Sequence, residues 1–145
     1  MNLSEHFTLE ELTHSDAALR NGWDNTPTEA EIENLTRLAG LLEQVRKLLG
    51  KPIHINSGYR SKQVNESVGS KDSSQHRIGC AADIKVADMT PNQVCLALKE
   101  SDIQFDQLIR EFDSWTHISV TNHVGDTPRN QMLIIDKNGT RPFSV

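Results

Sequence analysis

The longest regular pattern in this sequence of 145 residues is an amphipathic helix predicted over residues 27–49. Thr26 is its expected N-cap, with Pro27 in the first helical position and Glu29 completing a T-x-x-E capping box. Gly50 is the expected stop. Apolar residues recur between these ends at helical spacing, namely Ile32, Leu35, Leu38, Ala39, Leu42, Val45 and Leu49. We expect this helix to form the scaffold of the domain, with its apolar face against the core.

Shorter patterns complete the expected elements. A second helix is predicted from Thr90 to about Glu100, again with a capping box, and short helices over residues 8–13 and 61–66. Strand patterns cover five segments, residues 53–56, 81–86, 105–111, 115–120 and 131–135. The order of elements predicts an α+β fold, with a small, mostly antiparallel sheet and helices packed on one side of it. The length favours a single domain over residues 1–145.

Alternation in two of the predicted strands places polar groups opposite the core. In residues 81–86 the alternate positions are apolar, which leaves Asp83 on the other face. In residues 115–120 the inward positions are Ile118 and Val120, which leaves His117 on the outward face. An acid and a histidine on the non-core face of two strands can converge on one site.

Two of the six histidines stand in a context that favours metal binding. His76 lies in the string S-S-Q-H-R-I-G, a polar loop that leads into the strand of Asp83, and His117 is centred on its own strand. Two imidazoles and one carboxylate suit zinc and leave its fourth position for water. Spacing alone does not show that His117 meets the other two, and a single histidine is more typical of a surface or structural role.

Three motifs together carry a resemblance to a known family. They are S-G-Y-R-S over residues 57–61 followed by Asn65, S-Q-H-R-I-G-C-A-A-D-I over residues 74–84, and W-T-H-I-S over residues 115–119. They closely resemble the M15 family of zinc D-Ala-D-Ala carboxypeptidases and phage endolysin peptidases. The likeness covers most of the chain, and the combined pattern S-G-Y-R … H-x6-D … W-x-H is far more specific than any one part.

The resemblance implies a site and a fold. It implies one zinc ion per chain, held by His76, Asp83 and His117, in a fold like that of hedgehog and D-Ala-D-Ala peptidases. It also implies that Arg60 binds substrate or the developing oxyanion, a role that the fixed fork of guanidinium donors suits. A surface salt bridge is the alternative for Arg60.

The proton-transfer acid is less clearly marked. Many relatives place an acid three residues before the last zinc histidine, where this sequence has Ser114. The nearest acids are Glu111 and Asp113, and both would share the alternation of His117 if the chain stays extended. We prefer Glu111 as the catalytic base, because the branch of the family with E-F-x-x-W-x-H is most similar and because its side chain is longer. Asp113 is the alternative.

Further residues near the motifs are candidate substrate contacts, namely Ser57, Tyr59, Ser74, Gln75 and Trp115. The serines and the glutamine could equally hold the loop, and the two aromatic residues could equally pack in the core. We expect specificity to depend on the shape of the loops over residues 68–73 and 122–130.

Charge and hydropathy narrow the expected partners and location. A formal charge of -5 argues against nucleic acid as the main partner, and no apolar segment approaches the roughly 20 residues needed for membrane insertion. The N-terminus is acidic where a signal peptide would be basic and then apolar. We therefore expect a monomer made in the cytoplasm, which reaches peptidoglycan stem peptides after holin-type release or as part of a phage particle.

These expectations combine into one leading function and two alternatives. The leading function is zinc-dependent hydrolysis of a peptide bond in the peptidoglycan stem peptide. The enzyme would be a D,D-carboxypeptidase or an endopeptidase such as the L-alanyl-D-glutamate enzymes of phage lysins. The first alternative, motivated by Ser114, is a non-catalytic wall-binding module of the same fold that keeps the zinc. The second is a small structural protein without metal.

Overall fold

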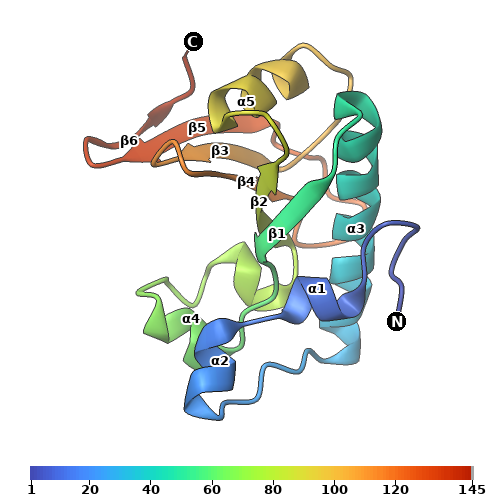
Figure 1. The fold of residues 1–145 in the computed structure, drawn as a ribbon, viewed down its shortest axis with the longest axis vertical. Helices are drawn as coiled ribbons and strands as arrows, with labels where there is room; N and C mark the ends of the chain where they lie inside the picture. Colours follow the sequence, from blue (N-terminus) through green and yellow to red (C-terminus); the bar gives the residue numbers. More distant parts are fainter. Residues whose placement is uncertain (145) are drawn as a thin grey trace.

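The computed structural model describes residues 1–144 (Figure 1). Its helices are α1 (Leu9–Thr13), α2 (Asp16–Asn21), α3 (Glu29–Leu49), α4 (Lys62–Ser67) and α5 (Pro91–Lys99), with a 3₁₀ helix η1 (Gln75–Ile78). Its strands are β1 (Ile53–Ser57), β2 (Ala81–Val86), β3 (Gln107–Glu111), β4 (Trp115–Ser119), β5 (Gln131–Asp136) and β6 (Gly139–Pro142). In these residues no helix has both the length and the hydropathy to cross a membrane.

The strands form one six-stranded sheet in the order β1-β2-β4-β3-β5-β6. Strands β3 and β5 pair in parallel, whereas the other neighbours are antiparallel. The sheet is therefore mixed, which corrects the expectation of a mostly antiparallel sheet. The reason is geometric: β4 ends where β3 begins, so a strand that starts there on the far edge of β3 must run parallel to it. The backbone N–H of Asn130 donates to the carbonyl of Phe105 at that end.

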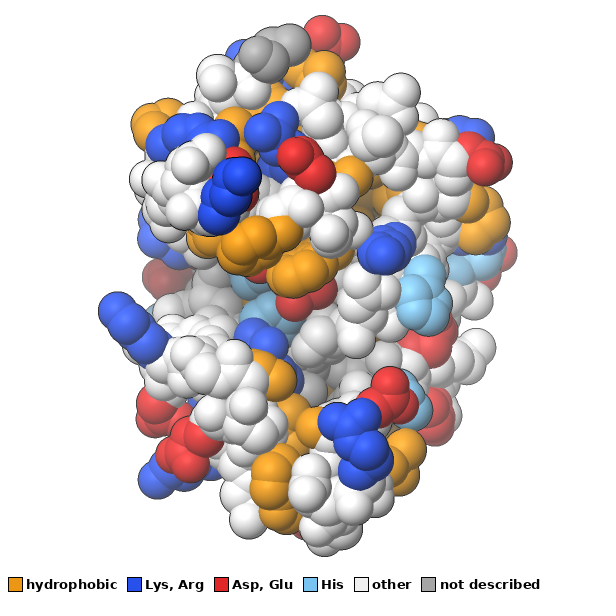
Figure 2. All heavy atoms as spheres, turned by 60° about the vertical axis from the view of Figure 1, so that its left-hand side comes forward, with side chains coloured by type: hydrophobic (Ala, Val, Ile, Leu, Met, Phe, Trp, Pro, Cys, Tyr) orange, Lys and Arg blue, Asp and Glu red, His pale blue; other side chains and the backbone are white. Residues whose placement is uncertain are grey.

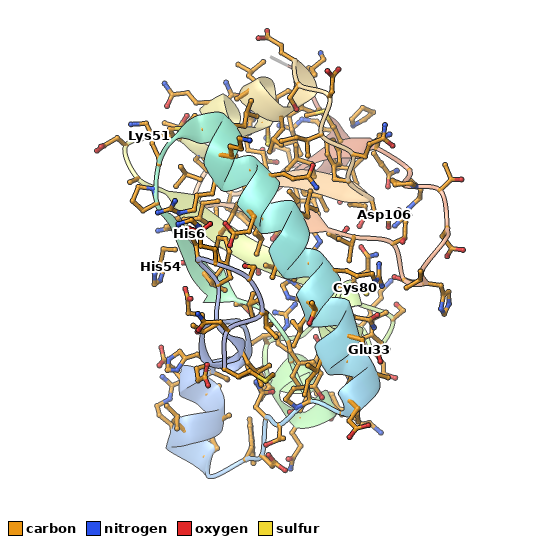
Figure 3. All side chains as sticks on the ribbon, turned by 90° about the vertical axis from the view of Figure 1, so that its right-hand side faces the viewer. His6, Glu33, Lys51, His54, Cys80 and Asp106 are labelled. Atoms are coloured by element: carbon orange, nitrogen blue, oxygen red, sulfur yellow. The ribbon has the colours of Figure 1, made fainter. Side chains whose placement is uncertain are left out.

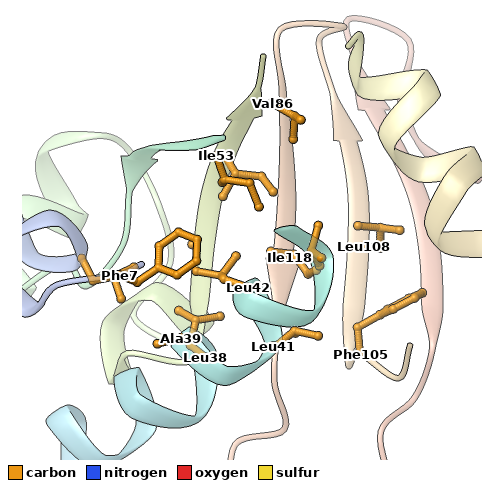
Figure 4. Close-up of a cluster of buried hydrophobic side chains, with 14 of the residues drawn as sticks. Phe7, Leu38, Ala39, Leu41, Leu42, Ile53, Val86, Phe105, Leu108 and Ile118 are labelled. Atoms are coloured by element: carbon orange, nitrogen blue, oxygen red, sulfur yellow. The ribbon is translucent and has the colours of Figure 1, made fainter. Parts of the chain in front are cut away.

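Helices α3 and α5 cover one face of this sheet, as expected. Their buried side chains, including Leu38, Leu42 and Leu98, belong to one hydrophobic core with Ile84 and Ile118 from the strands. Figure 4 shows Leu38, Leu42 and Ile118 in this core. Burying a leucine of this kind contributes about 1.5–3 kcal/mol. The predicted alternation is confirmed, because the apolar positions of β2 and β4 lie in the core. The α+β class is confirmed as well, while the hedgehog-like fold stays a prediction.

The remaining helices lie together at one end of the molecule, where α1, α2 and α4 gather near the end of β1 (Figure 1). The helices predicted at residues 8–13, 61–66 and 90–100 are confirmed within one or two residues. Helix α2 and strand β6 were not predicted. Strand β6 is four residues long and pairs only with β5, so its sequence carries little pattern.

The start of α3 differs from the sequence expectation. Its N-cap is Thr28, whose side chain accepts from the backbone N–H of Glu31 while the Glu31 side chain accepts from the N–H of Thr28. Two T-x-x-E boxes overlap in this stretch, and the later one forms. Thr26 lies before the helix, with its N–H donating to the Asp24 carboxylate at 2.9 Å.

Cap removal should distinguish the two boxes. Thr28→Ala is expected to lower the free energy of unfolding by about 1 kcal/mol, because a first-turn N–H loses its acceptor. Thr26→Ala is the matched control and should cost much less. Chemical denaturation of both variants measures the difference. A larger loss in Thr26→Ala than in Thr28→Ala would contradict this helix start.

Candidate metal centre

Strand pairing brings two of the predicted ligands together. Strands β2 and β4 are neighbours, and Asp83 and His117 are direct partners in their register, on the face opposite the core. The 3₁₀ helix that precedes β2 supplies His76. Its Nε2 lies 3.3 Å from Asp83 Oδ1, and His117 Nδ1 lies 3.1 Å from the same oxygen. One ligand atom from each of the three residues lies within 4.8 Å of the others.

The orientation of His76 is set by the backbone. Its Nδ1 donates to the carbonyl of Gly58 at 2.8 Å, which turns Nε2 toward Asp83 as the nitrogen available to a metal ion. The chain of Gly58 passes so close to the carbonyl of Leu12 that any Cβ on this glycine would collide with it. The next residue, Tyr59, donates its N–H to that same carbonyl at 2.7 Å. The S-G-Y-R motif therefore needs a glycine at position 58, because only glycine can lie this close to Leu12. That position puts the Gly58 carbonyl where it accepts from His76 Nδ1.

The donor set fits a zinc ion. Burial by itself raises the pKa of the Asp83 carboxyl, but His76 and His117 more than offset it and hold the pKa below its usual range. The carboxylate is thus ionised at neutral pH, in a site where all three residues are buried. Two imidazole nitrogens and one carboxylate oxygen that converge in this way are the donors of a catalytic zinc site.

The three residues lie at the floor of an open cleft with a volume of about 520 Å³. Figure 2 shows a hollow across this face, with histidine and acidic side chains in its depth and hydrophobic side chains above them. Besides the three ligands, the cleft is lined by Arg60, Val68, Ser70, Ser74, Glu111, Phe112 and Trp115. The site is therefore open to a ligand of peptide size.

Glu111, the last residue of β3, faces this site. Its Oε1 lies 3.9 Å from His117 Nδ1. Burial, followed by the nearby charge of Asp83, raises the pKa of the Glu111 carboxyl, against the opposing effects of His117, Trp115 and Arg60. A half-buried acid with a raised pKa beside a candidate metal centre is placed to exchange protons with a water molecule there.

Asp113 does not reach the cleft, because the chain does not stay extended after Glu111. Phe112 and Asp113 have φ of 53° and 50°, and the N–H of Ser114 donates to the carbonyl of Glu111 at 3.0 Å. This tight turn sends Asp113 to the other side, where its carboxylate pairs with Arg110 at 3.1 Å and is largely exposed. The expectation that both acids share the alternation of His117 is therefore wrong for Asp113.

Arg60 follows β1 and extends into the cleft. Its backbone N–H donates to the carbonyl of His76 at 2.9 Å, which ties it to the segment of that ligand. Burial lowers the pKa of the Arg60 guanidinium, while the carboxylates of Asp83 and Glu111 act in the opposite direction. A guanidinium keeps its charge in proteins. Arg60 is therefore a cation held beside the candidate metal centre.

Comparison with known proteins settles the family. A sequence model described as Peptidase M15 matches residues 5–119, which include the three candidate ligands, Arg60 and Glu111. The chain belongs to the M15 peptidase family. Membership implies a metallopeptidase, and M15 peptidases are typically zinc-dependent. A search of curated proteins gives no significant match.

The candidate substrate contacts of this M15 peptidase fall into two groups. Ser74 and Trp115 line the cleft. Ser57 is the register partner of Asp83 on β1 and is absent from the cleft lining. Tyr59 is 4% exposed and belongs to the hydrophobic core. Tyr59 therefore packs in the core, which was the alternative to a substrate contact.

Gln75 points away from the cleft of the M15 peptidase. Its amide nitrogen lies 3.0 Å from both Asp106 Oδ2 and the Val120 carbonyl, and 2.8 Å from Asn122 Oδ1. These contacts hold the 3₁₀ helix of His76 against the segment that follows β4. Gln75 is placed to hold the loop, which was the other role expected for it.

Three cleft residues were not named as candidates from the sequence. Val68 and Ser70 belong to the loop expected to shape specificity, whereas Phe112 lies inside the string E-F-x-x-W-x-H. The only feature of the sequence that pointed to Phe112 was its position next to Glu111. The other loop expected to shape specificity, residues 122–130, lines a separate polar cavity of about 500 Å³ beside Asp106.

Proposed function

We propose that this M15 peptidase hydrolyses a peptide bond in the peptidoglycan stem peptide, as a D,D-carboxypeptidase or as an endopeptidase. The observation that carries the proposal is the position of Glu111. Its carboxylate lies 3.9 Å from His117 at the floor of a cleft that also holds His76 and Asp83. The family suggests peptidoglycan as the substrate. Travel to the wall by holin-type release or in a phage particle is part of the same proposal.

His76, Asp83 and His117 would hold the zinc ion. When bound there, zinc supplies a Lewis acid for the scissile carbonyl and lowers the pKa of water toward about 7. The Asp83 carboxylate reduces the net positive charge of the site, and the Gly58 carbonyl keeps His76 in the tautomer whose Nε2 is a ligand.

Glu111 would move the protons of the reaction. It accepts a proton from the attacking water at its carboxylate and delivers it to the nitrogen of the leaving amine. A carboxylate whose pKa is raised by burial accepts the proton of the water more readily than an exposed one. Because its pKa lies closer to neutral pH, the acid that forms can then give the proton to the leaving amine. The raised pKa therefore suits both halves of the role.

Arg60 would bind the negative charge of the substrate. Its side chain is half-buried beside the cleft, and its buried Nε has no hydrogen-bond partner among the described residues. A planar fork of donors suits either a substrate carboxylate or the oxyanion that develops from the scissile carbonyl. Both candidate reactions present these two groups, because each leaving residue carries a carboxylate.

The wall-binding module is the weaker reading. It rests on Ser114, which stands where many relatives have an acid. Ser114 lies in the β3–β4 turn, with its hydroxyl donating to the carbonyl of Phe112, and Glu111 places an acid in the cleft from the preceding strand. The cleft therefore contains an acid, Glu111, although position 114 is a serine.

Purified cell-wall sacculi test this function. Protein loaded with zinc is expected to free new amino groups from sacculi. Protein treated with a chelator should free none until zinc is added back. The count of free amino groups over time is the measurement, and the same sacculi incubated without this protein are the blank. Zinc-loaded protein that frees no amino group from any wall preparation would refute the peptidase function.

A further inference from the structure

The turn between β3 and β4 has a backbone that its sequence does not favour. Two successive residues with positive φ, Phe112 and Asp113, and the hydrogen bond from Ser114 N–H to the Glu111 carbonyl make the pattern of a type I′ turn. Asparagine and glycine are the usual residues of such a turn. A phenylalanine there costs conformational energy, which the surrounding structure must offset.

The folded chain buries only part of the Phe112 side chain in return. Its side chain is 52% exposed, although the backbone is held firmly, with the Phe112 N–H donating to the carbonyl of Ile135 on β5 at 2.8 Å. The ring tilts by 38° against Trp115, with centroids 6.0 Å apart. A large apolar side chain on a strained and anchored backbone, without burial in the core, is the kind of outlier that occurs at functional sites.

The exposed ring borders the cleft, and it is not alone there. Val68, directly after α4, is 53% exposed and lines the same cleft, as does Trp115. These three residues, which we call the apolar wall, come from two segments, because Phe112 and Trp115 belong to the β3–β4 hairpin and Val68 follows α4. The neighbouring residue of the same strained turn, Asp113, is paired with Arg110 and lies outside the cleft.

We propose that the apolar wall, with Phe112 as its principal contact, binds a small apolar side chain next to the scissile bond and so selects the peptide. This inference rests on the proposed peptidase function. In both candidate bonds, D-alanyl-D-alanine and L-alanyl-D-glutamate, the residue that supplies the scissile carbonyl is an alanine. Its methyl group is the side chain that the wall would remove from water.

Phe112→Gly separates this role from a role in folding. Glycine adopts positive φ without strain, so the variant should unfold at the same temperature as the wild type or higher. Its kcat/KM on wall peptides should fall roughly 10-fold through a rise in KM, with kcat largely kept. Asp113→Gly is the matched control, because it relieves strain in the same turn without touching the cleft. It should raise the unfolding temperature and leave KM unchanged.

The selectivity of the variants is the decisive readout. Synthetic stem peptides with alanine or glycine before the cleaved bond are the probes. The wild type is expected to prefer alanine, Phe112→Gly to lose that preference, and Phe112→Leu to restore most of it. A Phe112→Gly enzyme with the KM and the alanine preference of the wild type would overturn the proposal and leave the peptidase function intact. A wild type without turnover on any wall peptide would remove both.

Discussion

Asp83→Asn is expected to abolish zinc binding and to lower kcat/KM at least about 1000-fold, which corresponds to the several kcal/mol that a catalytic metal supplies. Asp83 lies between the two imidazoles, 3.3 Å and 3.1 Å from their facing nitrogens. The amide that replaces it keeps the shape but no longer offsets the charge of the cation. Elemental analysis of the purified variant measures zinc per chain directly.

Zinc-dependent unfolding gives a second readout that needs no substrate. A ligand that binds only the folded state stabilises it by about 2.7 kcal/mol at 100 times its Kd. The unfolding temperature of the wild type should therefore rise with added zinc, and that of Asp83→Asn should not. His54→Ala is the matched control, since His54 is an exposed histidine on β1 outside the cleft (Figure 3). An equal rise in Asp83→Asn would contradict the assignment of this ligand.

Glu111→Gln is expected to keep zinc and to lose 10²- to 10⁴-fold in kcat, roughly the range of a general acid–base group. Glutamine has nearly the shape of glutamate but does not accept the proton of the attacking water. KM should change little, because the substrate contacts proposed for Arg60 and the apolar wall are retained. Initial rates on a stem peptide at saturating zinc give both constants.

Asp113→Asn is the control for this variant. Asp113 lies in the same turn region but pairs with Arg110 outside the cleft, so its neutral form should have the kcat of the wild type. Zinc content must be equal in the three proteins, which excludes a loss of metal as the cause. Full activity of Glu111→Gln, or a loss in Asp113→Asn instead, would assign the base elsewhere.

The candidate metal centre could be predicted because it depends on regular structure. Alternation alone places Asp83 and His117 opposite the core, and strand pairing then makes them direct register partners. That pairing was not predictable from the spacing of residues, since β3 comes between β2 and β4 in the sequence but not in the sheet. The resemblance to M15 peptidases supplied the missing contact.

The side chains around the metal centre could be predicted less well, because they depend on a turn without the usual signature. Alternation assumes an extended chain, and the turn at Phe112 and Asp113 contains no glycine or asparagine to reveal it. Asp113 was therefore expected on the wrong face, and Phe112 was missed. Tyr59 shows the same limit, since a motif does not tell which of its side chains enters the core.

The predictions of the start of α3 and of the direction of β5 were wrong for separate reasons. Two overlapping T-x-x-E boxes, beginning at Thr26 and Thr28, satisfy the same local rule, and the proline between them favoured the wrong one. The parallel pairing of β5 depends on which edge of β3 is free, a property of the whole sheet. Local patterns carry no information about that edge.

Mass analysis of muropeptides tests the peptidase function most directly. Sacculi are digested by the wild type and by Glu111→Gln at equal zinc content, and the soluble fragments are compared. The wild type is expected to produce fragments shortened at one stem-peptide bond, by loss of terminal alanine or by separation of alanine from glutamate. Glu111→Gln should leave almost all masses unchanged. Unchanged masses after digestion by a wild type that holds one zinc per chain would contradict hydrolysis and favour the wall-binding module.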